Sequence, residues 1–229
     1  MTAARVAMTL PASGLAVQRP FHLQAGVATI VDPSEADGLD ADWVLRAQPG
    51  EFWWPRGGTL ADILTRVPDA FDAVQAVPRP LVAAAGSDAF VYRVPADAQR
   101  HARRLVVRSG GQGSRPLTSW YPIELLTYAG TLPQAEIEDG LAKGVVQLDT
   151  RVHDALAAIE AGGAVEFPRP SVADNALFAA DVSALGEGDG FRLRDDLAEL
   201  ERRVTALEQR LTARAIRKVH SVLRRGGST

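Results

Sequence analysis

The segment over residues 41–58 constrains the fold more than any other part of the chain. It opens with a short apolar run, Trp43–Leu45, of the kind that forms a buried strand. After a polar turn come an acid, Glu51, and an aromatic block, Phe52–Trp54, and then Pro55–Gly58 closes the segment as a loop. Because open α/β sheets bind ligands beyond the carboxyl ends of their strands, this strand and its loop predict a ligand site.

The composition is that of an ordinary globular protein, with 46% apolar and 23% charged residues. A length of 229 residues predicts one domain with an appendage. The formal net charge of −3 predicts no affinity for nucleic acid. The absence of cysteine excludes disulfides, thiol nucleophiles and cysteine-based metal sites. Since the chain shows neither a signal-like segment nor an apolar run long enough to span a membrane, we expect a cytoplasmic protein.

The first 40 residues have the pattern of a βαβ unit. A strand, a helix and a second strand are expected over Arg5–Leu10, Leu15–Gly26 and Ala28–Val31. A polar loop containing Asp32 and Asp37 follows the second strand. By residue type alone these two acids are more typical of a solvated turn than of a binding loop. His22 lies on the apolar face of the expected helix, where we expect a residue at the edge of the core.

Several of these segments resemble bacterial family 2 glycosyltransferases of the GT-A fold. Glu51–Pro55 matches the end of the family segment Asp-Ala-Asp-Glu-Phe-Trp-Trp-Pro, and Trp120–Leu126 resembles a later family strand. Asp32–Ser34 and Asp37-Gly38 resemble the family loop Asp-Asn-x-Ser-x-Asp-Gly. The resemblance implies an α/β fold of GT-A type, with a mixed sheet and flanking helices, and sugar transfer from a nucleotide-sugar donor.

The resemblance also implies roles for single residues. Asp32 and Asp37 would contact the nucleotide. Trp53 and Trp54 would stack on a sugar, although aromatic residues in such a loop can equally belong to the core or to an interface. No catalytic residue is identified, and Glu51 is the one candidate.

The chain departs from the family where a metal would bind. The two aspartates of the family's Asp-x-Asp pair fall on Gln48 and Gly50. Because magnesium and manganese take several oxygen ligands, no metal ligand is predicted, and a divalent metal is expected only if the donor site survives. Gly38 is followed almost at once by Trp43, which shortens the nucleotide-binding half. The sequence therefore predicts a glycosyltransferase-like protein, a pseudoenzyme whose catalysis is impaired or absent.

The middle of the chain predicts further strands and helices. Strands are expected over Phe71–Val77, Leu81–Ala85, Phe90–Val94 and Leu105–Arg108, and helices over Leu60–Val67, Asp139–Arg151, His153–Ala161 and Asp174–Leu185. Thr59 is expected to cap the first of these helices, with Asp62 three residues on. Pro78–Pro80 would separate the first two strands. The glycine-rich stretch Ser109–Ser119 predicts a surface loop rather than a phosphate cradle. A group of mixed charge, Asp149, Arg151, His153 and Asp154, is typical of salt links on the surface of a helix.

The last 40 residues have a different pattern. A glycine-containing linker separates a domain over 1–188 from a segment over 189–229. Leucine and valine recur there with heptad spacing from Leu193 to Leu211, which predicts a coiled-coil-like helix that self-associates or folds back on the domain. The basic residues after Leu211 predict either contact with an anionic membrane surface or a solvated helix end. The alternative function is therefore a non-catalytic scaffold that binds a partner through this helix.

Overall fold

The fold is seen in a computed structural model, which describes residues 2–14, 16–96, 104–117 and 122–168. The chain divides into two units, Met1–Gly186 and Glu187–Thr229, and every described residue belongs to the first. The heptad pattern from Leu193 to Leu211, the basic tail and the helix expected over Asp174–Leu185 lie outside the described residues. No helix of the described residues is long and apolar enough to cross a membrane.

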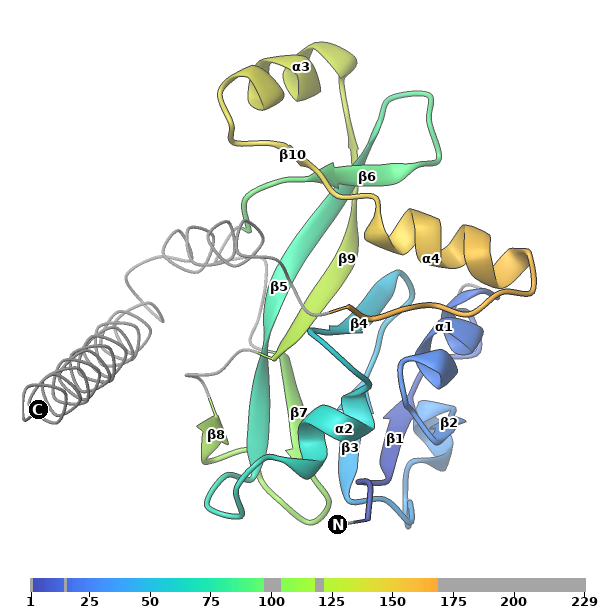
Figure 1. The fold of residues 1–229 in the computed structure, drawn as a ribbon, viewed down its shortest axis with the longest axis vertical. Coiled ribbons are helices and arrows are strands. Elements are labelled where there is room, and N and C mark those ends of the chain that lie inside the picture. Colours follow the sequence, from blue (N-terminus) through green and yellow to red (C-terminus); the bar gives the residue numbers. More distant parts are fainter. Residues whose placement is uncertain (1, 15, 97–103, 118–121, 169–229) are drawn as a thin grey trace, which may run out of the picture. The chain divides into compact units, whose positions relative to one another are not determined.

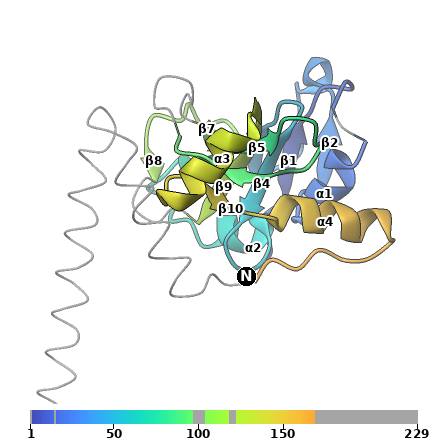
Figure 2. The same ribbon diagram turned by 90° about the horizontal axis from the view of Figure 1, so that it is seen from above.

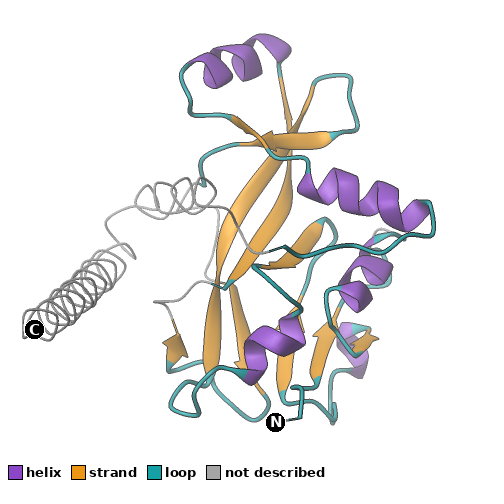
Figure 3. Ribbon diagram, in the orientation of Figure 1, coloured by secondary structure: helices purple, strands orange, loops and turns teal. Residues whose placement is uncertain are grey.

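The described chain is an α/β structure of ten strands, four α-helices and one short 3-10 helix (Figure 3). The strands are β1 (Val6–Thr9), β2 (Thr29–Val31), β3 (Trp43–Arg46), β4 (Glu51–Pro55), β5 (Ala73–Ala84), β6 (Phe90–Arg93), β7 (Arg104–Arg108), β8 (Pro116–Leu117), β9 (Ile123–Leu132) and β10 (Gln147–Leu148). The helices are α1 (Gln18–Gln24), α2 (Leu60–Thr65), α3 (Gln134–Ala142) and α4 (Arg151–Glu160), and the 3-10 helix is η1 (Pro33–Glu35).

The ten strands join in one mixed, mostly antiparallel sheet that forks at β5. The first half of β5 pairs with β7 and β8, and β7 continues through β3 and β1 to β2. The second half of β5 pairs with β6 and β9, which continue to β10 and β4 respectively. One 12-residue strand therefore carries two branches of the sheet (Figure 1). The α/β class is confirmed.

The first branch contains the three parallel strands β2, β1 and β3. All four residues of β1 are buried, because the strand is central and covered on both faces, and its sequence is accordingly apolar throughout apart from Thr9. The strands predicted over Arg5–Leu10 and Ala28–Val31 are confirmed within one or two residues. Parallel strands end at a common edge, so the turns after β1, β2 and β3 share that edge.

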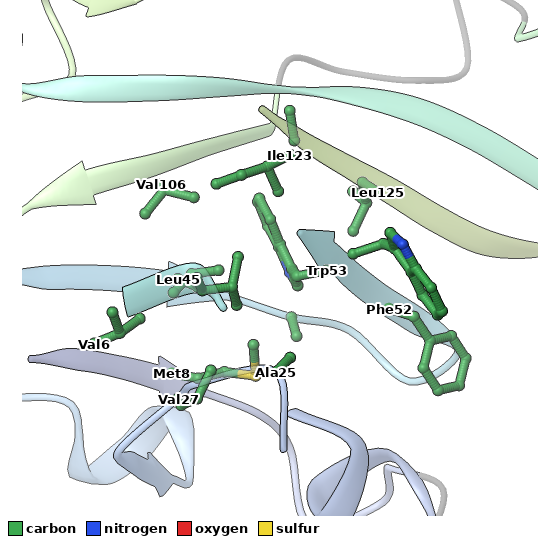
Figure 4. Close-up of a cluster of buried hydrophobic side chains, with 14 of the residues drawn as sticks. Val6, Met8, Ala25, Val27, Leu45, Phe52, Trp53, Val106, Ile123 and Leu125 are labelled. Carbon is green, nitrogen blue, oxygen red and sulfur yellow. The ribbon is translucent and has the colours of Figure 1, made fainter. Parts of the chain in front are cut away.

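The segment Glu51–Pro55 is a strand, β4, and not the loop that the proline and glycines predicted. All five of its residues are buried, and it pairs antiparallel with β9. Alternation along the strand sends Phe52 and Trp54 to one face and Trp53 to the other. Figure 4 shows Trp53 among Leu45, Ile123 and other apolar side chains that join the two branches of the sheet. The aromatic block therefore builds the core.

The break predicted at Pro78–Pro80 is also wrong, since β5 runs through it without interruption. The carbonyl oxygen of Pro80 accepts a hydrogen bond from the N–H of Val94, which places the backbone of residue 80 on the β6 side. Residue 78 faces the same side by alternation, in the gap between the pairings with β7 and β6. The missing proline N–H groups therefore cost no bond to β9 on the other side.

The helix predicted over Asp139–Arg151 is wrong as well. Helix α3 ends at Ala142, and a turn through Gly144, at φ 70°, leads into β10. The returning chain packs closely on the helix at Gly140, where an added Cβ would lie 2.3 Å from Cγ2 of Val146. Helix α4 then begins at Arg151, in agreement with the helix predicted over His153–Ala161.

Helices α1 and α2 both pack against β4, and α4 contacts α1 and β6. Figure 2 shows α2 and α4 on the same side of the long strands. Thr59 caps α2 as its sequence predicted, because its hydroxyl accepts from the N–H of Asp62 while the Asp62 carboxylate accepts from the N–H of Thr59. These helices close one face of the β4–β9 pair, and the remaining opening lies beside α4.

Candidate functional site

A pocket of about 560 Å³ lies beside α4, at the branch of the sheet that contains β4 and β9. It is lined by polar and apolar side chains from β4, β5, β6, β9, β10, α4 and the segment that follows α4. These residues are Trp54, Arg56, Arg79, Arg93, Glu124, Gln147, Leu148, Asp149, Thr150, Arg151, Asp154, Ala155, Ala158, Ala164, Val165, Glu166 and Pro168.

Strand register explains why these side chains meet. Trp54 of β4 lies directly opposite Glu124 of β9, and Arg93 of β6 lies directly opposite Gln147 of β10. Arg79 of β5 is on the same face, diagonally adjacent to Glu124. Residues opposite or diagonal to one another across neighbouring strands share a face of the sheet. One row of side chains thus crosses five strands and forms the floor of the pocket.

Glu124 is the centre of the charged groups in this row and is only 3% exposed. Its Oε1 accepts from Nη2 of Arg79 at 3.0 Å and lies 3.6 Å from Nε of Arg56, while its Oε2 accepts from Nη1 of Arg151 at 2.6 Å. Burial raises the pKa of Glu124, but the charges of Arg151 and Arg79 outweigh burial and bring the pKa below its usual value. The carboxylate therefore stays ionised at neutral pH.

A second carboxylate fixes the guanidinium of Arg151. Asp149 accepts from Nε at 2.8 Å and from Nη2 at 2.7 Å in a bidentate pair. Burial raises the pKa of Asp149, and the hydrogen bonds from Arg151 more than offset that, so the pKa lies below its usual value. The Arg151 guanidinium also lies over the indole of Trp54, 5.4 Å from the ring centroid. Arg151 is therefore held in one orientation at the pocket wall.

The segment after α4 forms the other wall of the pocket. The carbonyl of Phe167 accepts from the N–H of Gly58, and the ring of Phe167 packs edge-on against Trp54 and Phe21. The carboxamide of Gln24 in α1 bonds to the backbone of both Gly163 and Val165. These contacts hold the segment beside α4, so the pocket has fixed walls on both sides.

The structure corrects the prediction that the charged group near α4 forms surface salt links. Arg151 instead bridges Asp149 and the buried Glu124 at the pocket, and Asp149 precedes the helix. His153 and Asp154 do form an exposed contact of 3.4 Å. The sequence analysis did not identify Arg79 and Glu124 as site residues. The one signal that could have done so is a charged residue within an otherwise apolar strand.

The acids expected to bind a nucleotide lie elsewhere, on the edge where the parallel strands end. Asp32 follows β2 and caps η1, since its Oδ1 accepts from the N–H and hydroxyl of Ser34. Its Oδ2 accepts from the N–H of Ala12 after β1, at 3.2 Å. Bonds from Ser34 are the main reason why the pKa of Asp32 is lowered. Asp37 is exposed in the following turn.

The turn between β3 and β4, where a metal-binding pair would stand in the family, is closed by buried side chains. The Gln18 amide donates to the carbonyls of Gln48 and Glu51, both at 2.7 Å, and accepts from the N–H of Gly50 at 3.2 Å. The Glu51 carboxylate accepts from the N–H of Gln48 at 2.8 Å and from Arg104 at 2.8 Å. Glu51, the candidate catalytic residue, is therefore engaged in holding the turn.

The candidate sugar-stacking residues differ in position. Trp53 is 0% exposed and offers no face to a ligand, whereas Trp54 borders the pocket. His22 is buried beneath the turn, as expected of a core residue rather than a base, and its Nε2 accepts from the N–H of Trp53 at 3.2 Å. Burial lowers the pKa of His22 to about 3, so its imidazole is neutral.

The described part of the chain contains no cluster of three or more histidine and acidic side chains that could hold a metal ion. Gln48 and Gly50 supply one neutral side-chain oxygen at most, so the residues present do not fit the divalent cation of the family. Compared with known proteins, the sequence matches no protein-family model and no curated protein.

Proposed function

We propose that this chain is a glycosyltransferase-like protein of GT-A type that binds a nucleotide-sugar and lacks metal-dependent sugar transfer. The observation that supports the nucleotide site is the carboxylate of Asp32 at the shared carboxyl edge of β2, β1 and β3. This edge is where open α/β sheets bind ligands. The family resemblance at Asp32–Ser34 and Glu51–Pro55 supports the nucleotide-sugar as the ligand class.

The absence of metal-dependent transfer is inferred from the turn between β3 and β4. In the family, a divalent cation there stabilises the departing diphosphate. Here the turn has no aspartate, its backbone bonds to Gln18, and the nearby Glu51 bonds to Arg104 and the turn itself. The protein would therefore bind the nucleotide through hydrogen bonds alone, and manganese would not strengthen that binding.

The test is calorimetric titration of the full chain with UDP and GDP, each with and without manganese. We expect binding that manganese does not change. Asp32→Asn should weaken it about tenfold, because the carboxylate charge is lost while an asparagine still caps η1. Asp88→Asn, at an exposed acid outside both sites, is the matched control and should bind as the unmodified protein does.

Two results would overturn the proposal. If neither UDP nor GDP binds at millimolar concentration, the chain has no donor site. A large gain in affinity with manganese would instead show a working metal site and contradict the loss of metal-dependent chemistry.

A further inference from the structure

We infer that the pocket beside α4 binds an uncharged saccharide. The pocket is lined by residues of the row on β4, β9, β5, β6 and β10 and by α4, and none of its lining residues belongs to the Asp32 edge. The inference therefore goes beyond the proposed nucleotide binding and stands without it.

The balance of charge in the pocket favours a neutral ligand over an anion. Four arginines line it together with four acids, Glu124, Asp149, Asp154 and Glu166. Glu124 and Asp149 remain ionised at neutral pH, because arginines surround them. Because the four positive and four negative charges balance, the pocket offers a phosphate no net attraction to offset the cost of removing it from water. An uncharged ligand has a much smaller desolvation cost.

The hydrogen-bonding groups suit hydroxyls, each of which can both donate and accept. Arg151 uses three N–H bonds on Asp149 and Glu124, and two of the five guanidinium N–H groups remain. The buried Oε1 of Gln147 has no hydrogen-bond partner. Buried polar atoms normally have a partner, and a turn of this amide would present an acceptor to a ligand without breaking any bond.

The pocket also offers apolar surface beside these polar groups. Trp54 lies in the floor, and Ala155 and Ala158 of α4 and Leu148 of β10 complete the lining. Leu148 is 65% exposed at the mouth, whereas Arg79 in the floor is 2% exposed. A sugar has this same combination of polar edges and apolar C–H faces, and a volume of about 560 Å³ is typical of a small-ligand site.

The experiment is saturation-transfer-difference NMR of the full chain with maltose, cellobiose and lactose, followed by calorimetry with any disaccharide that binds. We expect at least one of the three to bind with millimolar affinity. Inorganic phosphate is tested in parallel. Binding of phosphate in place of all three disaccharides would overturn the inference and mark an anion site.

Two variants on α4 form a matched pair. Ala158→Trp fills the pocket and should weaken disaccharide binding about tenfold, whereas Ala157→Trp, at an exposed neighbour outside the pocket, should leave it unchanged. Gln147→Ala removes the amide without filling space and should weaken binding by a smaller factor, which keeps the test decisive if Ala158→Trp does not fold.

Equal binding by Ala158→Trp, Gln147→Ala and the unmodified chain would overturn the inference. So would failure of all three disaccharides to bind. In either case, nucleotide binding that responds to Asp32→Asn would leave the proposed function intact. Saccharide binding at the pocket without any nucleotide binding would instead support only the saccharide pocket.

Discussion

The turn between β3 and β4 and the pocket beside α4 both gather buried polar side chains, but they use them differently. In the turn, the side chains of Gln18 and Glu51 form hydrogen bonds with the backbone of residues 48 and 51, which leaves no open volume between them. In the pocket, Arg151 and Glu124 bond to other side chains around an open volume. Polar groups that bond to backbone hold a conformation, whereas polar groups that line a hollow can also serve a ligand.

The largest effect is expected from the centre of the pocket row. Glu124→Gln removes the negative charge next to Arg79, Arg56 and Arg151 while nearly preserving its volume. Removing one partner of a buried ion pair typically costs about 3–5 kcal/mol, and we expect a loss of that size in the free energy of unfolding measured with urea.

Glu138→Gln is the control for that measurement, because Glu138 is exposed on α3. Its effect should stay within about 0.5 kcal/mol. A similarly small effect for Glu124→Gln would mean that the charged row does not depend on its carboxylate, and the contrast between pocket and turn would lose its basis.

A smaller effect is expected in the turn. Gln18→Ala deletes three hydrogen bonds, to Gln48, Gly50 and Glu51, each contributing about 1 kcal/mol net. We therefore expect a loss of about 3 kcal/mol in urea unfolding, with no change in disaccharide binding at the pocket. Gln134→Ala, at an exposed glutamine of α3, is the control. A loss of saccharide affinity in Gln18→Ala would show that the two regions are coupled.

The smallest of these effects is a dependence on pH at His22, below the turn. The unfolded chain takes up a proton near pH 6.5, whereas the folded chain does so only near pH 3. Stability is therefore complete above pH 6.5 and falls as the pH drops below it, by up to about 1.4 kcal/mol per pH unit. We expect the free energy of unfolding at pH 5 to be about 2 kcal/mol below that at pH 7.5.

His22→Gln should remove this slope, since glutamine keeps an acceptor for the N–H of Trp53 but does not titrate. His153→Gln, at an exposed histidine, should leave the slope as it is. The pocket carboxylates Glu124 and Asp149 have lowered pKa values and lose their contribution to stability only at more acidic pH. An unchanged slope in His22→Gln would thus show that a group other than the buried His22 sets the pH response.

Most errors of sequence interpretation arise where a residue's usual preference is overridden by its neighbours in space. Pro55 and the glycines after it suggested a loop, although Glu51–Pro55 forms a buried strand paired with β9. Pro78 and Pro80 suggested a break, although both face away from β9: Pro78 lies between the pairings with β7 and β6, and the carbonyl of Pro80 accepts from the N–H of Val94. The local preferences of residues carry no information on where the partner strands lie.

The opposite held where a signal is complete within a few residues. Thr59 and Asp62 cap α2 because both halves of the capping box lie within one helical turn. The strand β1 is visible as an apolar run because both of its faces are covered. The predicted nucleotide residues Asp32 and Asp37 lie after β2, as the βαβ pattern required.

The sequence by itself determined the α/β class, the parallel strands with their acidic loop, the caps and the lack of metal-binding aspartates at the turn. Only the tertiary structure decided that Trp54, Glu124, Arg79, Arg93 and Gln147 form one row. Those five residues come from five different strands, and the first and last of them, Trp54 and Gln147, are 93 positions apart in the chain. The physical reason is that strand register, which aligns such residues, is set by pairing between distant segments and by the core that those segments share.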